Sequence, residues 1–282
     1  TGNQPWNSVI GIITKVEFAS SVTRVPNYAF EGAVKLTTIT WEGIASVGNY
    51  AFKGCTGIKE TFTIPDQITT LGTNSFEGCS GITGLSLGTG LTDIPNSAFK
   101  GCSELTGISF PSNIKTIGDN SFDGCSKLGS ITFNEVITNI GSYAFYQCTS
   151  LKSVTIPGSV SSIGADAFSK ITGLATIIYN GGTNPCTGTA FIDTSATHAE
   201  VKITYNSETF CGKTPRTIDS CGSSKTACQY TYIHNTKVMT ITGSGTMDDY
   251  SGAVKTPWDG KKSVLKSLTI SGITSIGSNS FN

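Results

Sequence analysis

Few residues in this sequence have both the type and the spacing that catalysis requires. Nucleophilic catalysis places a Ser, Cys or Thr beside a base, and the only two histidines are His198 and His234, in the last third of the chain. The stretch Gly88–Gly90 lacks the GK[ST] continuation of a phosphate-binding loop. The pair Asp248–Asp249 lacks the alternating donors and the distal Glu of a calcium-binding EF-hand. We therefore expect no enzymatic activity, no metal and no cofactor.

The nine cysteines fall into two groups with different expected chemistry. Five share one position of a repeat, and we expect them to form a ladder of buried free thiols, because side chains in stacked parallel strands run side by side. They are Cys55, Cys79, Cys102, Cys125 and Cys148. The other four are Cys186, Cys211, Cys221 and Cys228. We expect disulfides among these four, with three possible pairings, and hence an extracellular compartment. A zinc site is the alternative, although no CxxC spacing supports it.

The composition narrows the class of partner. Only 13% of the residues are charged, and 19 basic residues balance 19 acidic ones. Binding to nucleic acid needs clustered Lys and Arg, whereas the basic residues here form no run. No apolar stretch reaches the roughly 20 residues that cross a bilayer. We therefore expect no nucleic-acid partner and no membrane-spanning segment, and a surface built mainly from Ser, Thr, Asn and Gly.

The strongest pattern is a repeat. An Ala-Phe or Ser-Phe dipeptide returns at a near-constant interval along most of the chain. The phenylalanines of this series lie 22 to 24 residues apart, at Phe30, Phe52, Phe76, Phe99, Phe122, Phe145, Phe168 and Phe191. Chance does not produce such a register, so the chain is built from units of about 23 residues.

One unit, Leu105–Cys125, illustrates the elements that we expect. It holds two short extended patterns, the first from Leu105 to Phe110 and the second from Ile114 to Ile117, separated by turn residues. Neither is long enough for an ordinary helix. A single unit is too small to bury its own apolar side chains, so neighbouring units must stack in parallel and share a core. The sequence thus predicts a mostly β, elongated solenoid of parallel strands.

The motif AFxGCxxLxxIxIPxxIxxIG resembles the BspA-like, or Treponema pallidum-type, leucine-rich repeats of bacterial and protist surface proteins. The best matches are Ala98–Cys102 and Leu151–Gly164, and the resemblance covers residues 18 to about 205. It implies a leucine-rich-repeat solenoid that takes part in adhesion or partner binding.

The remaining residues divide the chain further. We expect the repeat array over residues 1–205, a β-rich cap or spacer over 206–256, and the truncated first unit of a following array over 257–282. Within the spacer, Gln229–Ile233 and Lys237–Thr242 alternate like the strands of a hairpin. Trp258 repeats the setting of Trp6, 252 positions earlier. This recurrence indicates tandem modules or protomers joined head to tail, because solenoid ends expose unpaired strands.

The first strand of each unit should turn small hydroxylated side chains outward, onto the face that we expect to be concave. We predict a binding surface made of Thr38, Thr40, Ser86, Ser109, Ser130, Thr132, Ser153, Thr155 and Thr176. The unit at Lys59–Ile64 carries one extra residue, so the sequence leaves open whether Thr61 and Thr63 keep the pattern. High β-propensity accounts for part of this composition, and recognition of a ligand is the functional interpretation.

Together these patterns favour a cell-surface or secreted protein that binds an extracellular protein or glycan through its repeat surface. The first alternative is a structural protein that assembles head to tail into a filament or coat. Ice binding by the regular Thr rows is a minor alternative, because Gly and Ser interrupt those rows.

Overall fold

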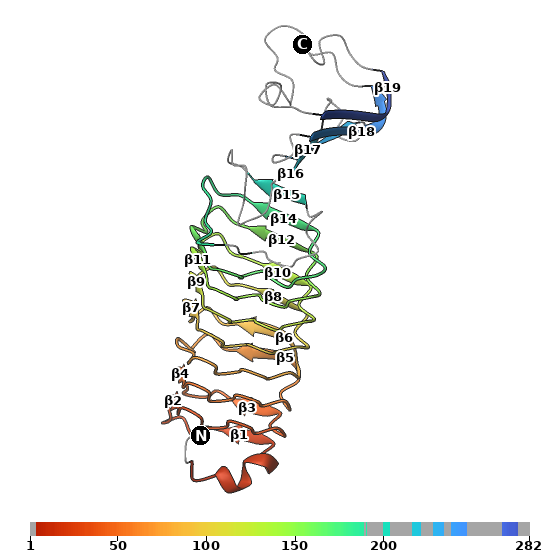
Figure 1. The fold of residues 1–282 in the computed structure, drawn as a ribbon. Helices are drawn as coiled ribbons and strands as arrows, with labels where there is room; N and C mark the ends of the chain where they lie inside the picture. The colour runs from red at the N-terminus through yellow and green to blue at the C-terminus, as the bar shows by residue number, and fades with distance from the viewer. Residues whose placement is uncertain are drawn as a thin grey trace.

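The computed structural model describes residues 4–188 and 190, together with the backbone of strands at 200–203, 216–220, 228–233, 238–246 and 267–275. The repeat units stack as successive windings of one elongated solenoid (Figure 1). It begins with a short 3-10 helix, η1 (Asn7–Ile12). The predicted solenoid of parallel strands with a spacing of about 23 residues is confirmed.

Each winding contributes one strand to a first sheet and a shorter one to a second sheet. The first sheet contains β1 (Lys15–Glu17), β3 (Thr38–Thr40), β5 (Glu60–Ile64), β6 (Ile82–Leu87), β8 (Gly107–Ser109), β10 (Ser130–Thr132), β12 (Ser153–Ile156), β14 (Thr176–Tyr179) and β15 (Glu200–Ile203). The second contains β2 (Arg24–Val25), β4 (Ser46–Val47), β7 (Asp93–Ile94), β9 (Thr116–Ile117), β11 (Asn139–Ile140) and β13 (Ser162–Ile163).

The strands pair in parallel with their equivalents in the adjacent windings. For example, Ile131 of β10 lies opposite Ile108 of β8. Strand pairing divides the first sheet into three groups, β1-β3, β5-β6-β8-β10 and β12-β14-β15, so no described strand ladder joins β10 to β12. The extra residue near Lys59 is absorbed by an irregularity between Glu60 and Thr61.

The core is organised around a column of phenylalanine rings. Neighbouring rings from Phe30 to Phe168 have centroids 5.2 to 5.6 Å apart and are nearly parallel. Trp6 extends the column at its N-terminal end, because its ring stacks on Phe30 at 5.7 Å. The alignment predicted from the spacing is thus confirmed for the described rings, and Phe191 lies outside the described residues.

Tight turns place each phenylalanine in the core. The residue two positions after the ring has a positive φ, and in five windings it is a glycine with φ between 71° and 78°. Gln147 and Lys170 occupy this position in the last two described turns, with φ of 59° and 60°. Glycine adopts this left-handed conformation without the steric cost that a Cβ introduces, which explains why the repeat motif contains Gly before Cys.

A separate sheet follows the solenoid. It contains β16 (Arg216–Ser220), β17 (Cys228–Ile233), β18 (Val238–Thr246) and β19 (Ser267–Ser275). Strands β17 and β18 pair antiparallel, as expected for the hairpin, and β18 pairs in parallel with β19. The division into an array, a spacer and a following unit stays a prediction.

Two buried serines offer a test of the repeat's packing. Ser75 and Ser121 directly precede core phenylalanines, where other windings have Ala, such as Ala98 and Ala144. Both serines are fully buried, and their hydroxyls have no hydrogen-bond partner among the described residues. A buried hydroxyl without a partner loses its hydration and gains nothing in return. The alanine windings show that the position has no need of the hydroxyl.

We predict that Ser121→Ala raises the free energy of unfolding by about 1 kcal/mol, because it removes an unsatisfied buried hydroxyl. Urea titration followed by tryptophan fluorescence measures the change. The reverse substitution at the equivalent position, Ala98→Ser, is the matched control and should lower the same quantity by a similar amount. A less stable Ser121→Ala variant would contradict the prediction.

Candidate functional site

The nine predicted surface residues lie on the outer side of the first sheet in two rows. Row one includes Thr38, Ser130, Ser153 and Thr176, and row two includes Thr40, Ser86, Ser109, Thr132 and Thr155. We call these residues the hydroxyl face. Seven of them are exposed, and Thr40 and Thr176 are half-buried. Pairing of Thr61 with Gly84 and of Thr63 with Ser86 shows that the irregular winding keeps both rows.

Most hydroxyls of this face are available to a ligand. Thr40 donates to the Val16 carbonyl at 3.4 Å, and Thr38 lies 3.4 Å from the Thr37 hydroxyl. The hydroxyls of the other seven residues form no hydrogen bond with the described part of the chain. None of the residues that make up the two rows, from the winding of Thr38 to that of Thr176, is charged. The face therefore presents regularly spaced donors and acceptors on a rigid sheet.

A pocket of about 290 Å³ opens in this face at the break between β10 and β12. We call it the β10 pocket, and it is lined by Ile131, Thr132, Phe133, Glu135, Thr155, Pro157 and Asn180. Thr132 and Thr155 are among the residues that the sequence predicts on the surface. The pocket itself has no such signal in the sequence, because Ile131 and Phe133 match the inward positions of the repeat.

Ile131 and Phe133 are more exposed than the equivalent residues of the two neighbouring windings. Their equivalents in the preceding winding, Ile108 and Phe110, are only 5% and 4% exposed. In the following winding Val154 and Ile156 are also buried, whereas Ile131 and Phe133 are partly exposed. The ladder and the tight packing of the first sheet are thus both interrupted here. The same combination occurs at β3, where Ile39 and Trp41 are partly exposed and no described ladder joins β3 to β5.

Ring contacts and hydrogen bonds nevertheless hold the pocket's Phe133 and the loop that follows it. The Phe133 ring stacks on Phe110 at 5.7 Å and meets Phe145 edge to face at 5.9 Å. Asn134 takes the position of Pro111 and fixes the loop that carries Glu135. Its side-chain amide donates to the Pro111 and Ile114 carbonyls, and its oxygen accepts from the Val136 and Ile137 amides at 2.9 Å each.

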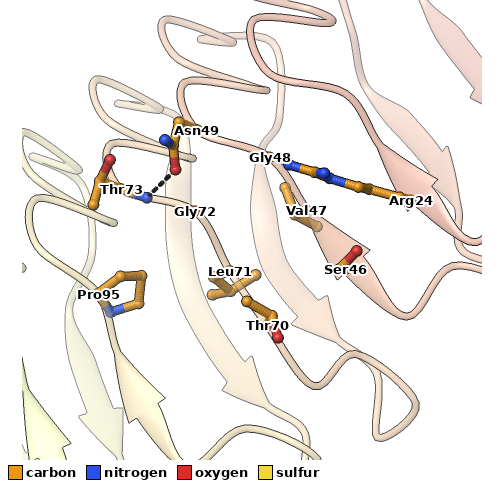
Figure 2. Close-up of a pocket in the computed structure, with 10 residues that line it drawn as sticks. All are labelled: Arg24, Ser46, Val47, Gly48, Asn49, Thr70, Leu71, Gly72, Thr73 and Pro95. Carbon is orange, nitrogen blue, oxygen red and sulfur yellow. Dashed lines mark hydrogen bonds between the residues drawn. The ribbon is translucent and has the colours of Figure 1, made fainter.

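A second pocket, of about 410 Å³, lies along the second sheet and is lined by residues of four windings, from Arg24 to Pro95 (Figure 2). Arg24 is its only charged lining residue, and the guanidinium lies 3.5 Å from the Asn27 side-chain oxygen. The Asn49 side-chain oxygen accepts a hydrogen bond from the Thr73 amide at 3.0 Å. Backbone, glycine and small side chains make up most of the wall, which offers few groups for specific recognition.

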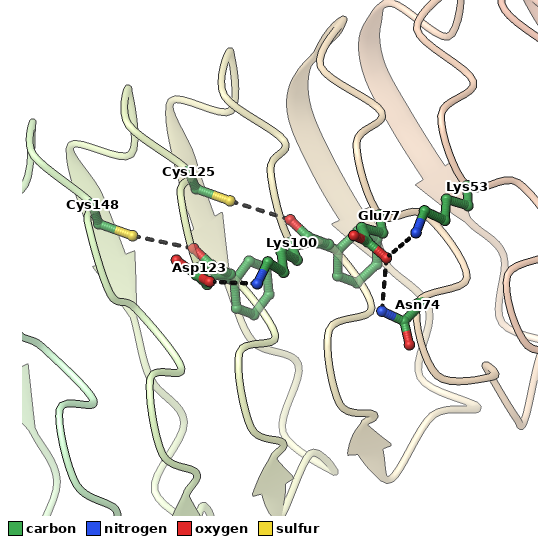
Figure 3. Close-up of polar contacts among 9 residues, drawn as sticks. Lys53, Asn74, Glu77, Lys100, Asp123, Cys125 and Cys148 are labelled. Carbon is green, nitrogen blue, oxygen red and sulfur yellow. Dashed lines mark hydrogen bonds and ion pairs between the residues drawn. The ribbon is translucent and has the colours of Figure 1, made fainter. Parts of the chain in front are cut away.

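The five repeat cysteines form the expected ladder of buried free thiols. Each thiol donates to the carbonyl of the phenylalanine in the preceding winding, at sulfur-to-oxygen distances of 3.1 to 3.5 Å. Figure 3 shows this contact for Cys125 and Cys148. Burial raises the pKa of Cys55 to about 12 and also raises the pKa values of the other four. These thiols are therefore structural and poorly nucleophilic.

Charged side chains one position after the phenylalanines alternate in sign along the stack. Lys53 pairs with Glu77 at 3.1 Å, and Lys100 pairs with Asp123 at 2.9 Å (Figure 3). The hydrogen bond to Glu77 is the main cause of a raised Lys53 pKa. Ion pairs whose lysine remains partly exposed, as in these two, stabilise proteins little. We assign them no ligand.

Comparison with known families settles what kind of repeat this is. The family description "BspA type Leucine rich repeat region" matches in six copies, over residues 10–107 and 92–214. This chain belongs to the BspA-type leucine-rich-repeat family. No curated protein matches it.

Among solved structures, this BspA-type chain is similar to a leucine-rich repeat protein from Eubacterium ventriosum, with 30% identity and a TM-score of 0.51. That match covers 55% of this chain and 42% of the other, so the chain spans less than half of that relative's length. A Treponema pallidum leucine-rich repeat protein shows 25% identity and a TM-score of 0.43, over 63% and 72% of the two chains. A Bacteroides ovatus leucine-rich repeat protein shows 20% identity and a TM-score of 0.47, over 96% and 76%.

Most of the predicted disulfide, histidine and acidic residues of this BspA-type chain lie outside the described residues. Cys186 is disulfide-bonded and packs against the core. Cys211, Cys221, His198, His234 and the Asp248–Asp249 pair lie outside the described residues, and the side chain of Cys228 is not described. The described part contains no cluster of His, Cys, Asp or Glu suited to a metal and no helix long and apolar enough to cross a membrane.

The raised thiol pKa values predict a specific alkaline sensitivity of this BspA-type array. In the unfolded chain thiols ionise near pH 8.5, whereas the buried thiols stay protonated to higher pH, about 12 for Cys55. The unfolded state then binds fewer protons than the native state, so stability falls as pH rises above about 8.5. Each such thiol should contribute a slope of about 1.4 kcal/mol per pH unit in that window.

Urea unfolding at several pH values between 8 and 11 measures this slope. The variant Cys102→Ala removes one thiol and should show a shallower slope than the unchanged chain. The difference between the two proteins isolates the thiol from Lys and Tyr, which titrate in both. Equal slopes would contradict the assignment.

Proposed function

We propose that this BspA-type chain acts at the cell surface or after secretion, where its hydroxyl face binds an extracellular protein or glycan. The supporting observation is the pair of rows that runs along the first sheet, in which seven of the nine hydroxyls are exposed and seven have no hydrogen-bond partner within the described chain. Hydroxyls both donate and accept hydrogen bonds. The sheet holds them at fixed spacing, so a ligand meets an organised surface without the cost of ordering it.

The absence of charge from the two rows suggests how the face would recognise a partner. Charged interfaces gain association rate by electrostatic steering, which these rows do not provide. Each hydroxyl contact contributes modestly, and affinity then depends on repetition along the face or on several copies of the protein. This behaviour suits an adhesion protein that engages a repetitive surface or a long glycan.

The cysteines support an oxidising compartment. Disulfides persist mainly outside the reducing cytosol, and Cys186 is disulfide-bonded. Free thiols in such a compartment are prone to oxidation when they ionise and are accessible. The five ladder thiols are buried, so the array tolerates that environment. Membership of the BspA-type family supports a scaffold for binding over a catalyst.

The test replaces exposed hydroxyls outside the β10 pocket by long charged side chains. We predict that a variant with Ser86→Lys, Ser109→Lys and Ser130→Lys loses at least tenfold in affinity for a bound partner, because the lysines block the face and leave its hydroxyl contacts unmade. Surface plasmon resonance against extracellular-matrix proteins and immobilised glycans identifies the partner and measures the loss.

A matched control carries the same added charge elsewhere. Thr92, Thr138 and Ser161 are exposed beside strands of the second sheet, and their replacement by Lys should leave affinity unchanged. If the first variant binds as tightly as the unchanged chain, or if both variants lose binding equally, the hydroxyl face is not the binding surface.

Head-to-tail assembly is a second candidate function, supported by the strand edges. Leu268 of β19 corresponds to Val16 of β1 by the same offset of 252 that relates the two tryptophans. Strand β19 pairs in parallel with β18, whereas β1 pairs among the described strands only with β3. An open strand edge is a template for pairing with another chain.

If the open edge of β1 is used for assembly, sedimentation velocity should show species that grow with protein concentration, and negative-stain microscopy should show rods of more than one solenoid in length. A single monomeric boundary over a hundredfold range of concentration would argue against this second function.

A further inference from the structure

We propose that the β10 pocket is a subsite for one ring of a neutral saccharide, with Phe133 as its apolar platform and Glu135 as its main hydrogen-bond acceptor. The inference rests on the proposed function, because the pocket interrupts the hydroxyl face, and it names the ligand class for that face. Four features of the pocket support it: its shape, its ring, its polar groups and its charge.

The shape suits a single ring. The pocket measures about 290 Å³, which is at the lower end of the range for small-ligand sites. It lies where the column of inward side chains changes from Phe133 to the smaller Ile156, and where β10 and β12 are not joined by a strand ladder. Residues of three consecutive windings line it: β10 and its loop, β12 with Pro157, and Asn180 after β14.

Phe133 provides a preformed apolar surface. One face of its ring is covered by Phe110, and Phe145 meets it edge to face. The opposite face is directed along the stack toward the winding of Thr155 and Pro157, which line the pocket with it. The faces of a pyranose ring carry C–H groups, whose positive edges are attracted to the negative face of an aromatic ring. Because Phe133 is already fixed, little side-chain entropy is lost on binding.

Polar groups surround this platform. Glu135 is exposed and takes part in no ion pair in the described part of the chain. A carboxylate accepts hydrogen bonds from hydroxyl groups, and such charge-assisted bonds are stronger than neutral ones. The hydroxyls of Thr132 and Thr155 and the side-chain amide of Asn180 complete the rim, and none of the three has a described partner. A sugar ring presents this combination of apolar faces and a hydroxylated edge.

The charge selects among saccharides. Glu135 is the only charged residue that lines the pocket, so sialylated or sulfated sugars would meet repulsion without a Lys or Arg to neutralise them. A protein ligand is disfavoured for a different reason. An apolar side chain inserted beside Phe133 would desolvate Glu135 and the two threonine hydroxyls without matching them. The pocket therefore favours neutral hexoses or N-acetylhexosamines.

The experiment uses the full chain and a glycan array that contains neutral, sialylated and sulfated oligosaccharides, followed by titration calorimetry with the best neutral ligand. We expect binding to neutral saccharides only. Glu135→Gln should weaken that binding about tenfold and Phe133→Leu by a similar factor. Glu42→Gln, which removes an exposed carboxylate outside the pocket, should change nothing.

Glu135→Gln alters an exposed side chain, so loss of the fold does not explain a loss of binding, and circular dichroism of each variant checks this. The inference is overturned if no neutral saccharide binds, if Glu135→Gln binds as tightly as the unchanged chain, or if anionic glycans bind better. The triple-lysine variant of the hydroxyl face separates the two proposals. If a protein partner depends on that face while no saccharide binds, the proposed function stands and the β10 pocket is not a sugar site.

Discussion

The whole molecule depends on one constraint: no winding can bury its phenylalanine without the winding beside it. Rings from Phe30 to Phe168 stack at 5.2 to 5.6 Å, slightly more than the spacing of adjacent strands. Backbone groups likewise find their hydrogen-bond partners in the adjacent winding. The Phe99 amide donates to the Ser121 carbonyl of the next winding at 2.9 Å, and the Cys125 thiol donates back to the Phe99 carbonyl at 3.3 Å. Every unit thus supplies partners for the polar groups of its neighbour.

This constraint restricts the residue types at inward positions and leaves those at outward positions largely unrestricted. Inward positions must be apolar and of matching size, whereas the outward positions of the first sheet only have to suit a strand. The hydroxyl face can therefore vary without cost to the fold. The β10 pocket lies where Phe133 is followed in its column by the smaller Ile156. This pocket has formed without any change in the length of the winding.

The period, the parallel stack, the free-thiol ladder and the outward rows follow from the sequence because each recurs at a fixed position of the repeat, the thiols in five windings. What the sequence did not reveal depends on how individual windings pack against their neighbours. Ile131 and Phe133 occupy regular inward positions, and their exposure depends on how β10 packs against β12. The only local signal is Asn134, which stands where Pro111 and Pro157 stand in the neighbouring windings. The stacking of Trp6 on Phe30 was also missed, because Trp6 lies outside the Ala-Phe series although its ring continues the column.

The alternating charges beside the phenylalanine column have a consequence for how the chain folds. Repeats of nearly equal sequence can pair with the wrong neighbour, since a skipped winding still aligns Phe with Phe and Cys with Cys. In the native order Lys53 meets Glu77 and Lys100 meets Asp123. Omitting a winding would instead place Lys53 beside Lys100 or Glu77 beside Asp123, two like charges at close range. Side chains that add little to the final stability thus disfavour misaligned intermediates in which a winding is skipped, and favour pairing of each winding with its neighbour in sequence.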